Sequence, residues 1–178
     1  GSHPNLIRVK GRIVGHPEAQ AGLLMQLIDP SYRNLAGLPS LASCTRDVYA
    51  NDTRLSAGVA LRIASGIASA AEHLHQHGIT HGDLYGHNIL WNEHGDCLLG
   101  DFGAASFHAI SDSLESRALQ RIEVRAFGIL LGELLERIDT GLSDQGRVHL
   151  EQLQQRCCQP QVLERPGFAE IVRVLENR

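Results

Sequence analysis

The sequence is poor in several features, and each shortage narrows what the chain can be. Lysine and arginine number 16 against 20 acidic residues, and the net charge of −4 argues against nonspecific nucleic-acid binding and a basic membrane-binding face. No apolar run approaches the roughly 18 residues that a membrane-spanning helix needs. The start, Gly1-Ser2-His3-Pro4, has no apolar core of a signal peptide. These absences predict a protein with no nucleic-acid and no membrane partner.

Cysteine is scarce too: the chain has Cys44, Cys97, Cys157 and Cys158. No CxxC pair is present, and no histidine stands at a zinc-type spacing from them. Adjacent cysteines rarely bond to each other, so Cys157 and Cys158 are expected to be free. The pattern favours reduced thiols and a cytoplasmic location.

What is present fits one folded domain, because 178 residues with 43% hydrophobic content can bury a core. Residues 6–14 and 22–28 read as two strands of a hairpin, the second well buried. Residues 31–50 are expected to form a loop with one short helix, and residues 104–118 a polar loop.

Helices follow. Apolar side chains recur every three or four residues over 54–77, a helix that Asp52 or Thr53 can cap and Gly78 can end. Further helices are expected over 121–137, 144–157 and 167–177. The predicted fold class is therefore α+β and mainly helical.

The residues richest in chemistry lie between 81 and 103. Two short apolar runs, Asn88–Trp91 and Cys97–Gly100, flank a turn and predict a hairpin that brings Asn88 and Asp101 to the same end. Asp83 lies on the loop just before. Two carboxylates and a carboxamide supply the oxygen ligands that Mg²⁺ prefers, and this donor set points to phosphoryl transfer.

These motifs resemble the eukaryotic-type protein kinase family. His81-Gly82-Asp83 with Asn88 is similar to the catalytic loop HRDxxxxN, and Asp101-Phe102-Gly103 is similar to DFG. The resemblance continues on both sides, in the segments similar to HPNI (3–7), strand 5 with the hinge (23–28), the start of helix F (123–128) and RPxF (165–168).

The resemblance implies roles for individual residues. Asp83 would be the catalytic base, and Asn88 and Asp101 would hold Mg²⁺. ATP would be the second cofactor, with Met25 as gatekeeper beside adenine. The backbone of two hinge residues would contact adenine: Gln26 and Ile28.

The resemblance also implies a domain layout and a partner. Residues 1–2 resemble a cloning scar, residues 3–29 a remnant of the kinase N-lobe, and residues 30–178 the C-lobe. No GxGxxG loop precedes Leu6, and Lys10, the only lysine, does not stand at the strand-3 position. The chain alone is therefore expected to be inactive or nearly so. It is expected to be a fragment of a longer kinase with a protein substrate, and the alternative is a natural minimal kinase-like protein. The surface that would face the N-lobe is expected to be apolar and to favour self-association.

Some positions depart from the family pattern. Gly82 replaces the arginine of HRD, which predicts no activation by a phosphorylated loop. Tyr85 replaces the lysine of Ser/Thr kinases, and Glu123 replaces the helix-F aspartate but can still accept from catalytic-loop N–H groups. Arg165 is expected to pair with Glu115.

Three functions stay open at this point. The first is a protein kinase that phosphorylates Ser/Thr hydroxyls in its full-length form. The second is a pseudokinase that serves as a binding or scaffolding module, favoured by Gly82 and Tyr85. The third is a small-molecule kinase, because His-Gly-Asp is the form seen in aminoglycoside and choline kinase-like enzymes.

Overall fold

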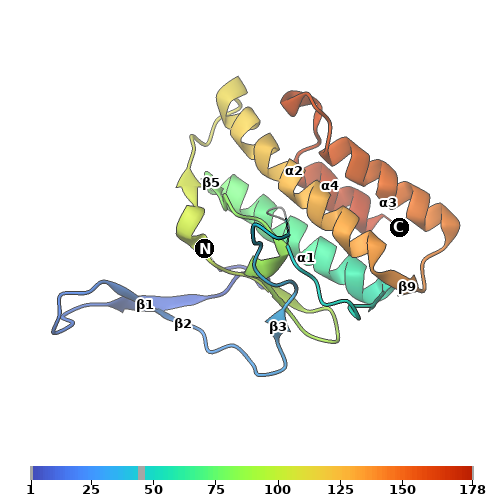
Figure 1. Cartoon of the computed structure of the whole chain (residues 1–178). Coiled ribbons are helices and arrows are strands. Elements are labelled where there is room, and N and C mark those ends of the chain that lie inside the picture. The colour runs from blue at the N-terminus through green and yellow to red at the C-terminus, as the bar shows by residue number, and fades with distance from the viewer. Residues whose placement is uncertain (1, 44–46, 178) are drawn as a thin grey trace.

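The computed structural model describes residues 2–43 and 47–177. Four α-helices form the body, and short strands and single 3-10 turns surround them (Figure 1). The helices are α1 (Ala57–Gln76), α2 (Leu114–Glu136), α3 (Asp144–Cys157) and α4 (Phe168–Glu176). The strands are β1 (Val9–Ile13), β2 (Gly22–Met25), β3 (Arg33–Asn34), β4 (Leu55–Ser56), β5 (Ile79–Thr80), β6 (Ile89–Trp91), β7 (Cys97–Leu99), β8 (Ser106–Phe107) and β9 (Ile138–Thr140). The mainly helical α+β class is confirmed.

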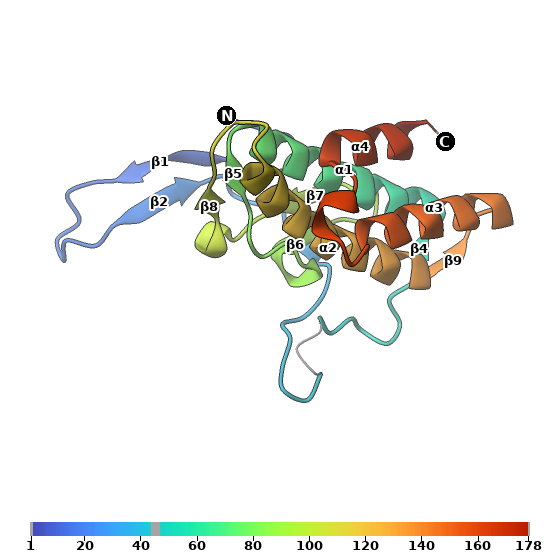
Figure 2. The same ribbon diagram turned by 90° about the horizontal axis from the view of Figure 1, so that it is seen from above.

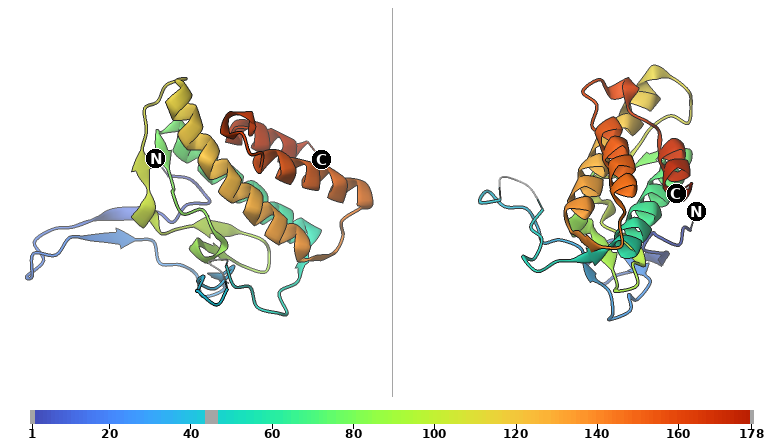
Figure 3. Two further views of the ribbon diagram at one scale, coloured as in Figure 1. Left: turned by 45° about the horizontal axis from the view of Figure 1, so that its top comes forward. Right: turned by 90° about the vertical axis from the view of Figure 1, so that its right-hand side faces the viewer.

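The core lies between α1 and its neighbours. Helix α1 packs against α4 and β7, and α2 packs against α3, so side chains such as Ile67 and Phe127 are fully buried (Figures 1 and 3). Ser56, rather than Asp52 or Thr53, caps α1: its side chain accepts a hydrogen bond from the Val59 N–H. The helix starts later than predicted because the preceding residues pair with β9 instead.

Helix α2 begins seven residues earlier than predicted. Ser113 caps it by accepting a hydrogen bond from the Ser116 N–H at 3.2 Å, and Glu115 lies in the first turn, where the helix dipole favours an acidic residue. The predicted loop over 104–118 is correspondingly shorter, and it contains β8, which pairs antiparallel with β5. The other two predicted helices match α3 and α4 closely.

The hairpin of β1 and β2 is confirmed, but the predicted burial of its second strand is wrong. Leu23, Leu24 and Met25 are each more than half exposed. The hairpin projects from the body, joined to it where Ile7 and Leu99 share a backbone hydrogen bond of 3.1 Å (Figures 1 and 2). An apolar run indicates a strand, but its burial depends on an element packing against it.

The helix predicted within 31–50 is also absent from the described residues. Strand β3 lies there and pairs with β6, completing the three-stranded sheet β3-β6-β7. Further along, Gly37 and Val48 form an antiparallel bridge, so the backbone is paired in an extended conformation instead of a helical turn. Residues 44–46 of this prediction lie outside the described residues.

Within the described ranges, no helix combines the length and apolarity that crossing a bilayer demands.

Candidate active site

The segment His81–Asn88 is tied to the body at its first residue. His81 is fully buried, and its Nε2 donates to the Gly100 carbonyl at 2.7 Å. Its Nδ1 accepts from the Asp83 N–H at 3.3 Å, so the ring is the neutral Nε2–H tautomer. One side chain thereby links the loop before β6 to the residue that follows β7.

Glu123 of α2 holds the next residue. One carboxylate oxygen accepts from the Gly82 N–H at 2.8 Å, and the other accepts from His75 Nε2 at 2.7 Å. The prediction that Glu123 can accept from the catalytic loop is confirmed. Gly82 has φ +81°, and a Cβ there would lie 2.3 Å from the Ala104 carbonyl oxygen. The backbone thus explains the missing arginine, because no larger side chain fits this conformation.

Asp83 and Asn88 are in direct contact. The amide nitrogen of Asn88 donates to the Asp83 carboxylate at 2.8 Å and to its carbonyl at 2.9 Å. The Asn88 carbonyl accepts from Gly100 N–H at 3.0 Å, the last step of the β6-β7 pairing. These bonds leave Asn88 Oδ1 without a donor among residues 2–43 and 47–177. The Asp83 side chain is 37% exposed and can reach a ligand.

Asp101 lies at the same end of this hairpin, as predicted. Its backbone is left-handed, with φ 52° and ψ 81°, and its Oδ1 accepts from the Gly103 N–H at 3.1 Å. Asn88 and Asp101 line one cavity of about 560 Å³, whose wall includes Gly37 and Gly100.

This donor set fits Mg²⁺. Asn88 and Asp101, which line the cavity, carry an amide oxygen and a carboxylate, and Mg²⁺ is commonly held by one or two carboxylates with waters and phosphate oxygens. In the described ranges, no three His, Cys, Asp or Glu side chains converge on a possible cation site. These residues therefore do not form a closed all-protein metal cage, and their oxygens fit an open site that the phosphate of a ligand would complete.

The predicted adenine contacts lie elsewhere. The Gln26 N–H donates to the Arg8 carbonyl at 2.8 Å, which leaves its own carbonyl for another partner. Gln26 and Ile28 line a separate cavity of about 900 Å³. Met25 is on the exposed hairpin and lines neither cavity. The structure therefore brings Asp83, Asn88 and Asp101 together, but it does not join the hinge residues to them.

Sequence reasoning does not identify two residues at this site: His87, which lies beside Asp83, and Asp47, which contacts His87. His87 Nδ1 donates to Asp47 Oδ1 at 2.7 Å, and His87 Nε2 lies 3.6 Å from Asp83 Oδ2. His87 stands within the motif but was given no role. Asp47 comes from a loop 40 residues earlier in the chain, and no spacing rule connects the two positions.

The predicted pairing of Arg165 with Glu115 is wrong. The Arg165 guanidinium donates to backbone carbonyls instead, to Gln159 at 2.8 Å and to Arg121 at 2.9 Å. Glu115 lies in the first turn of α2, because this helix begins earlier than predicted. Arg165 thus joins the end of α3 to α2, and it has no acidic partner among residues 2–43 and 47–177.

Comparison with known proteins identifies the class. The protein kinase domain family matches residues 2–122, more than half of the chain. The chain therefore belongs to the protein kinase domain family, and this fold and the arrangement of Asp83, Asn88 and Asp101 agree with that assignment.

Individual relatives carry kinase names. The chain is 29% identical to "Probable serine/threonine-protein kinase PknB" of Lactococcus lactis, over 75% of this chain and 22% of that protein. It is 25% identical to "Cyclin-dependent kinase 11.2" of Caenorhabditis elegans, over 66% of this chain and 16% of that protein. It is 31% identical to "Serine/threonine-protein kinase US3 homolog" of varicella-zoster virus, over 60% of this chain and 23% of that protein. The chain spans less than a quarter of each of these relatives.

Proposed function

We propose that the full-length protein carrying this chain transfers phosphate from Mg·ATP to Ser or Thr hydroxyls of a protein substrate. The observation that carries the proposal is the proximity of three polar side chains: the Asn88 amide donates to the Asp83 carboxylate, and Asn88 shares a cavity with Asp101. Phosphoryl transfer needs a hydroxyl-orienting carboxylate beside a metal site, and the proximity of Asp83, Asn88 and Asp101 supports this assignment of roles.

The residues divide the work. Asp101 and Asn88 Oδ1 would hold Mg²⁺, which when bound neutralises charge on the phosphates. Asp83 would hold the acceptor hydroxyl in line and take its proton, since one carboxylate oxygen is fixed by Asn88 and the side chain stays partly exposed. His81 and Glu123 fix the loop to the body through hydrogen bonds, so the Asp83 side chain would need little rearrangement to reach the acceptor hydroxyl.

The adenine contacts stay part of the proposal. The free carbonyl of Gln26 and the N–H of Ile28 would contact the base, with Met25 beside it. These 178 residues include neither a GxGxxG loop nor a lysine other than Lys10, so we propose that this chain alone transfers phosphate poorly.

Location and self-association also belong to the proposal. The described cysteines Cys97, Cys157 and Cys158 are free, and burial raises the pKa of Cys97 and of Cys157 to about 12. Such thiols stay protonated and unreactive, which supports a reduced, cytoplasmic protein. The exposed leucines of the hairpin support self-association through that surface.

A pseudokinase is the second candidate, because Tyr85, which is 40% exposed, puts no positive charge where Ser/Thr kinases carry lysine. In that case Asn88 and Asp101 would help to bind a nucleotide with Mg²⁺, but no phosphate would be transferred.

The test is phosphate transfer from labelled Mg·ATP by the full-length protein, compared with its Asp83→Asn variant. Removing the base should lower kcat by about 10²- to 10⁴-fold, while His94→Asn, on an exposed turn, serves as the matched control. Equal rates in the Asp83→Asn variant and the wild type would contradict the proposal. Nucleotide binding with no transfer to protein would favour the pseudokinase, and transfer only to a small hydroxyl compound would favour the small-molecule kinase.

A further inference from the structure

The His87 ring lies between two carboxylates, one buried and one partly exposed. The Asp47 side chain is only 2% exposed, and its Oδ1 accepts from His87 Nδ1 at 2.7 Å. Its Oδ2 accepts from the His87 N–H at 3.2 Å, so Asp47 fixes both the ring and its backbone. A carboxylate only accepts, so Nδ1 donates to Asp47. Nε2 is the atom turned toward Asp83, and it can hold that carboxylate only as a second N–H donor, that is, when the ring is the imidazolium.

The segment Asp47–Tyr49, here called the strap, is itself held on two sides. Val48 exchanges two backbone hydrogen bonds with Gly37, at 2.7 and 3.1 Å. The Tyr49 hydroxyl donates to Glu133 of α2 at 2.9 Å, and burial with this carboxylate nearby raises the pKa of Tyr49, so the hydroxyl keeps its proton. The residues that follow Asp47 are therefore held by the body, independently of its bonds to the catalytic loop.

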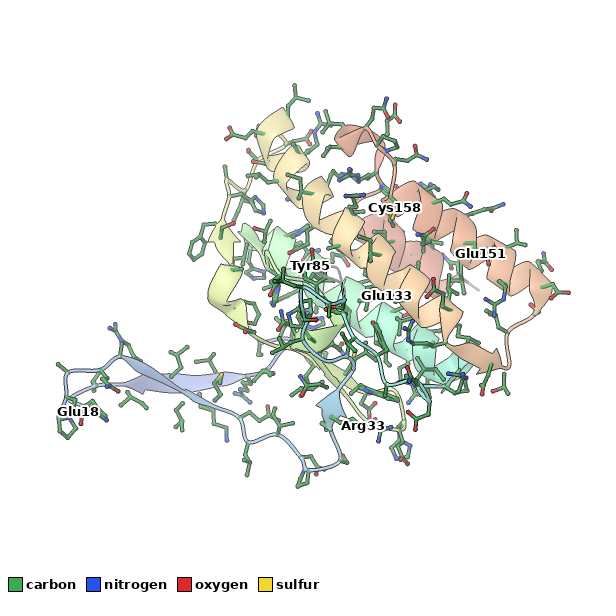
Figure 4. The ribbon with its side chains drawn as sticks, in the orientation of Figure 1. Glu18, Arg33, Tyr85, Glu133, Glu151 and Cys158 are labelled. Carbon is green, nitrogen blue, oxygen red and sulfur yellow. The ribbon has the colours of Figure 1, made fainter. Side chains whose placement is uncertain are left out.

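The strap also presses on the loop between Asp83 and Asn88. A Cβ at Gly86 would lie 2.7 Å from the Tyr49 hydroxyl oxygen and 3.0 Å from Asp47 Oδ2, so the side chains of the strap lie directly against the Gly86 backbone and leave no room for a larger residue. Figure 4 shows Tyr85, the residue before this contact, over the body on the same side as Glu133.

The contact with Asp83 falls on a particular atom. Oδ2 of Asp83 accepts from the Asn88 amide at 2.8 Å, and His87 Nε2 lies 3.6 Å from the same Oδ2. Catalytic hydrogen bonds are commonly long before substrate binds and shorten afterwards. Two groups on Oδ2 would hold the carboxylate in one rotamer and leave Oδ1 for the acceptor hydroxyl.

We propose that His87, oriented by Asp47, is a positioning residue that holds the Asp83 carboxylate for phosphoryl transfer. The inference rests on the proposed function, because Asp83 is the base of that reaction. It places the strap, which contains no kinase motif, within the machinery that sets the rate.

Two substitutions of His87 separate positioning from a merely structural role. The amide nitrogen of asparagine falls near the place of Nδ1, and that of glutamine near the place of Nε2. His87→Asn therefore keeps the bond to Asp47 and loses the reach to Asp83, whereas His87→Gln does the reverse. The assay is phosphate transfer by the full-length protein, with kcat and the KM for ATP measured separately and folding checked by thermal unfolding.

Positioning predicts that His87→Asn lowers kcat by about 10- to 100-fold with little change in KM, and that His87→Gln retains more of the rate. In an Asp83→Asn background, His87→Asn should cause no further loss, because the group that it positions is gone. A structural role predicts the opposite order, with His87→Gln the weaker variant in both stability and rate.

The outcomes are distinguishable. If His87→Asn matches the His94→Asn control while Asp83→Asn is inactive, the positioning role is wrong and the proposed function stands. If Asp83→Asn transfers phosphate like the wild type, the proposed function is wrong and the inference falls with it.

Discussion

The helical body and the β1-β2 hairpin differ in how deeply their apolar side chains are buried. In the body, Phe127 is 0% exposed and the catalytic loop is fastened by buried His81 and Glu123; in the hairpin, Leu24 is 58% exposed. Figure 4 shows the same contrast, with Glu18 at the hairpin tip far from Tyr85 in the body. The proposed metal and base sites belong to the well-packed part and the proposed adenine contacts to the exposed part. The two halves of the site should therefore respond very differently to substitution.

The largest contrast should come from truncating one apolar side chain in each part. Phe127→Ala removes a fully buried ring that packs edge-on against Phe168, and the cavity should lower the free energy of unfolding by about 3–5 kcal/mol. Leu24→Ala should change it by no more than about 0.5 kcal/mol, because that side chain is already in solvent. Urea unfolding measures both; similar losses would show that the hairpin is packed as the body is.

A smaller loss is expected where the catalytic loop meets α2. Glu123→Ala leaves the Gly82 N–H and His75 Nε2 without their partner, at about 1–3 kcal/mol for each orphaned buried group. Chemical denaturation gives the stability change, and phosphate transfer gives the effect on the loop. Glu123→Asp is the matched control, since it keeps the charge. A Glu123→Ala variant as stable as the wild type would mean that these bonds do not fasten the loop.

Gly82 tests whether the loop is fixed by its backbone. Gly82→Ala puts a side chain at φ +81° and against the Ala104 carbonyl, and the left-handed conformation alone should cost about 1–2 kcal/mol. Gly11→Ala, where a Cβ meets no atom within 4 Å, is the matched control on the hairpin. The thermal midpoint should fall for the first variant and barely change for the second. Equal midpoints would show that the loop adapts freely.

The smallest effect on stability is expected from making the hairpin polar. Leu24→Ser should leave the free energy of unfolding within about 0.5 kcal/mol of the wild type, because the site is exposed. It should nonetheless reduce self-association, which light scattering at increasing protein concentration would report. Unchanged association, or a monodisperse monomer in the wild type, would contradict the proposed contact surface.

Local sequence signals predicted much of the fold and the centre of the site. Asn88 and Asp101 lie together because a short hairpin forces its two ends together, and α3 is found over the predicted residues because Ser143 caps it and its apolar face is regular. Helix α1 starts later than predicted because Leu55 pairs with β9. The spacing of apolar residues along the chain does not reveal such a distant partner.

What escaped prediction depends on tertiary packing. Burial of β2 was inferred from its apolar run, but exposure is decided by what packs against it. Asp47 reaches His87 only because the strap bridges to Gly37 and to α2. Arg165 donates to backbone carbonyls and does not pair with Glu115 as the family resemblance implied, because Glu115 lies within α2. Each case joins residues far apart in the chain.

We propose above that Asn88 and Asp101 hold Mg²⁺ in the body of this kinase-family chain. The most direct measurement is calorimetric titration of the full-length protein with ATP, with Mg²⁺ and with EDTA, in the wild type and in Asp101→Ala. Asp139→Ala, on the exposed strand β9, is the matched control. We expect ATP binding that requires Mg²⁺, is lost in Asp101→Ala and is kept in Asp139→Ala. Binding that is equal in all three proteins, or indifferent to EDTA, would contradict it.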